Sequence, residues 1–261
     1  MLVLTVPPFL MSNLAATDTP GFRPFTPTHG AAVAGCAAVI AAVAWIGIYA
    51  RHARGAAAER RWRRGFGGFA LGVFVFSTVW NLLPGNFDWE SALPLQFCDL
   101  GLLVAGGVLL GGARWLRGLL YFWGTVFTLQ AFATPVLQAG PATVTFWLFW
   151  TAHTTITGAA VYDLAVGKFR PTFADAARSY LISIFYAVGL LALDNLTGWN
   201  YGYVGPAKPG TPTLLDALGE YPLRLLWMLL LVAAGYALAW APWAKKRSRG
   251  AEALRHLGTQ N

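Results

Sequence analysis

Two residues in this chain could do chemistry together if the fold brings them close. Cys98 lies in the segment LPLQFCDLG and His153 in the segment FWLFWTAHTTI. A cysteine in apolar surroundings is normally inert, because such surroundings disfavour its thiolate. A neighbouring imidazole changes this, since a Cys–His pair generates a thiolate that supports acyl transfer. The alternative for His153 is a packing role in which it hydrogen-bonds to a neighbouring segment.

Asp99, which follows the cysteine, is a candidate third member of this site. It could orient the imidazole of His153, or it could accept hydrogen bonds from threonine hydroxyls. His29 is an alternative base. Further polar side chains are candidates for binding a substrate, although two of them, Asp194 and Asn195, could equally mark only the end of a helix. The candidate binding residues are Asn81, Gln96, Gln130, Thr154, Asp194, Asn195, Asn200 and Tyr201.

Long apolar runs must position these residues. The runs fall near 30–50, 66–83, 93–112, 115–133, 143–166, 174–196 and 221–242. Most are close to the length of about 20 residues that spans a bilayer as a helix. In lipid only helices and closed barrels satisfy the backbone polar groups, and these runs have the length of helices. The sequence therefore predicts an all-α polytopic membrane protein, a bundle of seven transmembrane helices.

The loops between the runs alternate in charge. RHARGAAAERRWRR, after the first run, has six arginines and one glutamate, whereas PGNFDWESA, after the second, has only two acidic residues. Sixteen of the 19 Lys and Arg residues fall on one side of the predicted membrane. Because basic loops stay in the cytoplasm, the N-terminus is predicted outside and the C-terminus in the cytoplasm.

This topology divides the chain into an extracytoplasmic tail (1–28), a transmembrane domain (29–243) and a basic cytoplasmic tail (244–261). Apolar residues make up 56% of the sequence and charged residues 11%, which leaves little for a domain outside the membrane. The net charge of +8 sits in the cytoplasmic loops and the tail. Basic residues at these positions are attracted to the anionic lipid headgroups of the inner leaflet, so membrane lipids and not nucleic acid are the expected partners.

Most of the embedded polar side chains are predicted to lie in the outer half of the membrane. At 1.5 Å per residue, His153 lies about 15 Å below the outer surface. This distribution predicts a cavity that opens toward the outer leaflet. Both cysteines, Cys36 and Cys98, lie within apolar runs, so neither a disulfide framework nor a metal site is expected. No cofactor is implied.

Three segments resemble the YwaF family of bacterial integral membrane proteins. They are LPLQFCDLG (93–101), FWLFWTAHTTI (146–156) and NYGYVGPAKPGTPTLLDALGEYPLRLLW (200–227), and FTPTHG (25–30) looks like the start of that family. The resemblance implies a multi-pass protein of the bacterial cytoplasmic (inner) membrane. The family is similar in turn to eukaryotic TMEM-type ether-phospholipid acyltransferases. It is more remotely similar to androgen-induced multi-pass hydrolases, which use a threonine nucleophile and a histidine.

Transferred by position, the resemblance implies that Cys98 accepts the acyl group and that His153 is its base. The family pattern usually has histidine two residues before the cysteine, where this chain has Gln96. If that histidine carries chemistry, His153 or His29 must serve here; if it only hydrogen-bonds, glutamine can substitute.

The implied function is a membrane enzyme acting on lipid acyl esters, as an acyltransferase or hydrolase. One alternative is a transporter or receptor-like binder of a small apolar ligand, without catalysis. Another is a structural partner of a membrane complex.

Overall fold

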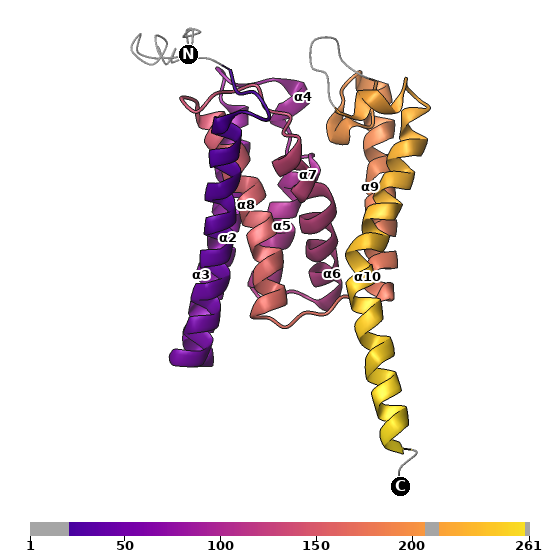
Figure 1. The fold of residues 1–261 in the computed structure, drawn as a ribbon. Coiled ribbons are helices and arrows are strands. Elements are labelled where there is room, and N and C mark those ends of the chain that lie inside the picture. The colour runs from indigo at the N-terminus through magenta and orange to yellow at the C-terminus, as the bar shows by residue number, and fades with distance from the viewer. Residues whose placement is uncertain (1–20, 207–213, 259–261) are drawn as a thin grey trace.

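The computed structural model describes residues 21–206 and 214–258, and every regular element in these segments is helical (Figure 1). A π-helical turn, η1, continues α6 into α7, and the 3-10 turns η2 and η3 lie between α9 and α10. The elements are α2 (Pro27–Ala53), α3 (Ala56–Leu82), α4 (Trp89–Ala92), α5 (Phe97–Leu109), α6 (Arg114–Phe122), η1 (Trp123–Phe127), α7 (Thr128–Ala133), α8 (Val144–Ala165), α9 (Phe173–Thr197), η2 (Tyr201–Tyr203), η3 (Leu214–Leu218) and α10 (Arg224–Gly258).

Five described segments are long and apolar enough to cross a membrane: α2, α3, Trp89–Leu109, α9 and Arg224–Ala244. The chain is therefore an all-α membrane protein with several apolar helices, as predicted. The other two predicted runs correspond to α8, with 22 residues, and to the interrupted helix α6–η1–α7. That these two also cross the membrane stays a prediction, as does the orientation of the termini.

One predicted helix boundary was wrong. The second run was expected to begin near residue 66, but α3 begins at Ala56 and includes four of the six arginines of the preceding loop. Its buried Glu59 explains the extension, because Glu59 pairs with Arg63 at 3.3 Å and accepts a hydrogen bond from Tyr162 at 2.8 Å. The last helix, α10, continues beyond residue 244 as far as Gly258. The segment predicted as a basic cytoplasmic tail (244–261) is therefore helical over its described part, and its cytoplasmic location stays a prediction.

The core lies where α5 packs between α3 and α8. Ala70, Leu102, Ala105 and Ile156 are almost fully buried there. Small residues let the helices approach closely: a Cβ atom at Gly106 would lie 2.6 Å from Leu71 of α3. The close packing fixes the relative register of α3, α5 and α8, and α5 and α8 carry Cys98 and His153.

Gly47 of α2 is the tightest contact between α2 and α8, because a Cβ atom there would collide with the ring of Tyr162. Replacing Gly47 by leucine is expected to lower the free energy of unfolding by about 3 kcal/mol, since overpacking forces the helices apart. Chemical unfolding of the detergent-solubilised protein measures this. Gly35, on the same helix, has nothing within 4 Å of such a Cβ. Gly35→Leu should therefore change stability by less than about 0.5 kcal/mol, and equal losses in both variants would contradict the packing.

Candidate functional site

Cys98 and Asp99 lie in the first turn of α5, at the end of the bundle opposite the arginine-rich loops. Cys98 is a free, half-buried thiol. Asp99 Oδ2 accepts a hydrogen bond from the backbone N–H of Gln96 at 3.0 Å. Asp99 therefore caps the N-terminus of its own helix. Among the described residues it forms no hydrogen bond with His153, so the orienting role considered for it has no support in the geometry.

His153 is buried in α8 with one ring nitrogen fixed and the other available. Its Nδ1 lies 2.7 Å from the carbonyl oxygen of Phe149, one helical turn earlier. A carbonyl only accepts, so Nδ1 must carry the proton and Nε2 then presents a lone pair. No hydrogen bond to Nε2 comes from any residue that the structure describes. The ring packs against Phe149 and Phe132, at centroid distances of 4.2 and 6.4 Å. The backbone thus holds this imidazole in the tautomer that a general base requires.

The register of α5 against α8 places Cys98 and His153 at the same level. Gly101 faces Ile156, with a Cβ at Gly101 lying 3.0 Å from the Ile156 side chain. Both helices run away from the α4 end of the bundle (Figure 1). Cys98 and His153 each lie three residues, or about one turn, before this contact. No hydrogen bond joins the two side chains within the described parts of the chain.

His29, the alternative base, has both of its ring nitrogens hydrogen-bonded to the backbone. Its Nδ1 accepts a hydrogen bond from the backbone N–H of Phe25 at 3.0 Å, which places the proton on Nε2. Nε2 in turn donates to the carbonyl of Phe132 at 2.8 Å. Both ring nitrogens are therefore occupied by backbone groups. His29 fastens the start of α2 to the end of α7, and it has no lone pair left for a substrate.

Three of the candidate binding residues brace the segment after α9 through hydrogen bonds to backbone groups. Gln96 accepts from the N–H of Gly202 at 3.0 Å, and Asn200 accepts from the N–H of Gly205 at 2.9 Å. Tyr201, fully buried, donates to the carbonyl of Trp89 at 2.6 Å and accepts from the N–H of Leu93 at 3.1 Å. These bonds hold η2 against the start of α5. The Nε2 amide of Gln96 keeps its two N–H donors unpaired among the described residues.

Asp194 is completely buried, and its Oδ1 accepts from the backbone N–H of Tyr201 at 3.0 Å. A Cβ at Gly205 would lie 3.1 Å from its Oδ2, and the carbonyl of Gly205 accepts a hydrogen bond from the buried Arg224. The buried carboxylate of Asp194 and the buried guanidinium of Arg224 therefore both lie next to Gly205. Opposite charges so placed offset each other's desolvation cost, which explains how both are tolerated.

The remaining candidates come from α3, α7, α8 and α9. Asn81 is half-buried at the end of α3, and Gln130 is exposed on α7. Asn195 is exposed and bonds to the carbonyl of Leu191 and the hydroxyl of Tyr221. Thr154, next to His153, is buried at a cavity between α2, α3 and α8. Lys208, in the predicted sixth loop, lies outside the described residues.

Two tyrosines outside the list of candidate site residues lie near the thiol. Tyr186 of α9 donates to the carbonyl of Leu95 at 2.6 Å and lies close enough to Cys98 to interact electrostatically. Tyr203 lies in η2, where burial raises its pKa to about 12, with a further contribution from nearby Cys98. Its φ of 61° is rare for a bulky residue. The polar segment NYGY signalled a functional loop, but nothing in the sequence showed that it folds back onto α5.

These features define a class: a multi-helix membrane protein with a thiol and a base-competent imidazole on neighbouring helices. Among the described residues no group of three or more His, Cys, Asp or Glu side chains could hold a metal ion. Residues 24–240 match the TMEM164 family, so the chain belongs to that family of membrane proteins. No curated protein and no solved structure matches the chain.

Proposed function

We propose that this protein is a membrane enzyme that transfers or hydrolyses lipid acyl groups through a thioester on Cys98. The observation that carries the proposal is the hydrogen bond from His153 to the carbonyl of Phe149, which leaves Nε2 as a base. The register of α5 against α8 supports it, because both residues stand at one level. The family match spans both residues. The resemblance to acyltransferases supplies the reaction class.

In the proposed reaction, His153 Nε2 takes the proton of the Cys98 thiol as its sulfur attacks the carbonyl carbon of a lipid ester. The resulting oxyanion is stabilised by hydrogen-bond donors, for which the unpaired Nε2 amide of Gln96 and the nearby hydroxyl of Tyr203 are the candidates. When the tetrahedral intermediate collapses, the ester C–O bond breaks and His153 returns its proton to the leaving lysolipid oxygen. A lysolipid hydroxyl or water then attacks the thioester, and the sulfur recovers its proton through the same imidazole.

The proposed setting is the bacterial cytoplasmic membrane, crossed seven times, with the N-terminus outside and the C-terminus in the cytoplasm. The distribution of Lys and Arg supports this orientation. Cys98 and His153 then face the outer leaflet, while the arginine-rich ends of α2 and α3 meet anionic headgroups on the inner side. No cofactor takes part in the proposed reaction.

The competing function is that of a transporter or receptor-like binder of a small apolar ligand. The apolar cavity between α2, α3 and α8 favours such binding. The two functions differ in what they require of Cys98, because a binder tolerates alanine at this position and the enzyme does not.

Product analysis distinguishes the two functions. Purified protein in nanodiscs would be incubated with a phospholipid and an isotope-labelled lysolipid, and the labelled diacyl product and released fatty acid quantified by mass spectrometry. Wild type is expected to form one of them, and Cys98→Ala neither. Cys36, the other cysteine, is buried against Phe22, Phe146 and Trp150, so Cys36→Ala should retain activity. Equal turnover by Cys98→Ala and wild type would refute the proposed nucleophile.

A further inference from the structure

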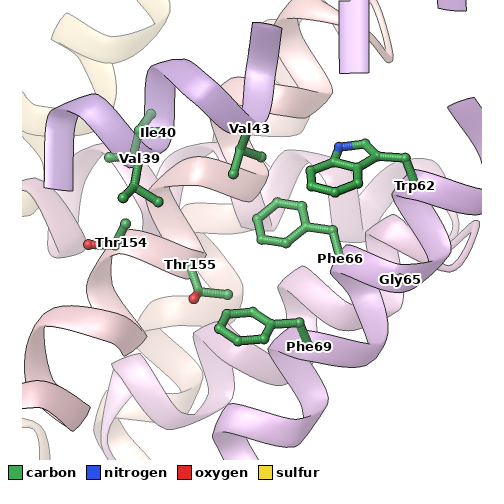
Figure 2. Close-up of a pocket in the computed structure, with 9 residues that line it drawn as sticks. All are labelled: Val39, Ile40, Val43, Trp62, Gly65, Phe66, Phe69, Thr154 and Thr155. Atoms are coloured by element: carbon green, nitrogen blue, oxygen red, sulfur yellow. The ribbon is translucent and has the colours of Figure 1, made fainter. Parts of the chain in front are cut away.

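A cavity of about 300 Å³ lies between α2, α3 and α8, apart from Cys98 (Figure 2). Its lining is almost wholly apolar. Figure 2 shows Val43 of α2 on one side and Phe66 and Phe69 of α3 on the other, with Thr155 of α8 between the two helices. The complete lining is Val39, Ile40, Val43, Trp62, Gly65, Phe66, Phe69, Thr154 and Thr155.

The cavity opens sideways, between two helices that are themselves apolar enough to span a membrane. Val39 and Phe69 at its mouth are 52% and 53% exposed, whereas Phe66 and Thr155 are buried. From Trp62 to Phe69 the helix rises about 10 Å, so the cavity is an elongated groove along α3. In a membrane an apolar groove of this kind faces hydrocarbon chains and not water.

Arginine side chains stand at one end of the groove. Arg61, Gly65 and Phe69 are spaced by four residues, so they form one row on α3. Arg61 and its neighbour Arg64 are exposed, and neither forms an ion pair with a described residue. This arrangement is complementary to a phospholipid: the guanidinium of Arg61 can pair with the phosphate, and the apolar groove can take the hydrocarbon chain.

Gly65 keeps the groove open. It is exposed, and a Cβ atom there would meet nothing within 4 Å. The protein packing does not require glycine at this position, in contrast to Gly47 or Gly106. A larger side chain would therefore fill the groove without disturbing the neighbouring helices.

We propose that this groove binds one acyl chain of a membrane phospholipid whose phosphate pairs with Arg61. The bound chain lies along Gly65 and Phe69 and reaches Thr155, near the middle of α8. This lipid is distinct from the one proposed to react at Cys98, because its ester groups lie at the arginine end of α3. The site therefore does not depend on the proposed acyl transfer.

The test uses the full-length protein in nanodiscs with a phosphatidylglycerol that carries a photoactivatable diazirine in one acyl chain. After irradiation, crosslinked peptides are mapped by mass spectrometry. Wild type is expected to show adducts concentrated on residues 62–69 and on 154–155. Gly65→Leu should lower this labelling by about tenfold, because the leucine side chain occupies the groove and the packing contacts of the bound chain are lost. Arg61→Gln should lower it by about fivefold.

Gly68→Leu is the matched control. Gly68 is also exposed on α3 with open space around it, but it does not line the groove. Labelling in Gly68→Leu should equal that of wild type, and all variants should keep the wild-type unfolding midpoint. A diazirine-labelled diacylglycerol, which has no phosphate and no charge, should label less than the phospholipid, and equal labelling by the two would overturn the pairing with Arg61. Undiminished labelling in Gly65→Leu, or adducts spread evenly over all lipid-facing helices, would overturn the site.

Discussion

Replacing His153 by alanine is expected to slow acylation of Cys98 by about 10²- to 10⁴-fold, the usual contribution of a positioned general base. The reason is geometric: the Phe149 carbonyl fixes the proton on Nδ1, so Nε2 is the one imidazole nitrogen in this part of the fold with an available lone pair. Single-turnover kinetics in nanodiscs, followed by the mass of the acylated protein, measure this rate directly.

His52→Ala is the control for this substitution. His52 is exposed in the last turn of α2, at the arginine-rich end and away from Cys98, so its loss should leave the acylation rate unchanged. If His153→Ala acylates within about twofold of wild type, the imidazole is not the base. The packing role for His153 would then stand.

Replacing Arg117 by alanine is expected to lower the free energy of unfolding by about 3 kcal/mol, the lower end of the cost of breaking a buried ion pair. Arg117 holds Asp163 with two hydrogen bonds of 2.8 Å and also donates to the carbonyl of Gly167 at 3.0 Å. Asp163 is only 8% exposed, so the substitution leaves a buried carboxylate without its partner.

Chemical unfolding of Arg117→Ala, Asp163→Ala and the double variant measures this coupling. The double variant should lose less stability than the two single variants together, because the second substitution removes the stranded charge. Arg178→Ala is the matched control, since Arg178 is exposed on α9 and forms no ion pair with a described residue. Strictly additive losses for Arg117 and Asp163 would contradict a specific pair.

Hydropathy located the helices because its signal is summed over some twenty residues. Hydropathy did not predict the start of α3, where the charged Glu59 is buried. Glu59 of α3 accepts a hydrogen bond from Tyr162 of α8, and a hydropathy profile contains no information on contacts between helices. The helix break at Leu93–Gln96 was also missed. A polar pair three residues apart at a helix start, such as Gln96 and Asp99, predicts the capping box that the structure shows there.

The candidate site was predictable only in part. Cys98 and His153 stood out because polar and reactive side chains are costly within apolar helices. That they stand at one level depends on the contact of Gly101 with Ile156, which is tertiary packing. Asp194, Asn200 and Tyr201 were expected to bind a substrate, yet their hydrogen bonds to the backbone of residues 89–205 hold a loop. Residue type alone cannot separate these uses, because the same donors and acceptors serve both.

The most direct test of the account is the mass of the intact protein after incubation with mixed phospholipids in nanodiscs. We expect an acyl adduct on wild type that hydroxylamine removes, that is absent from Cys98→Ala and that is strongly reduced in His153→Ala. An unmodified wild type that still co-purifies with a lipid or small molecule would contradict thioester chemistry and favour a binder or transporter.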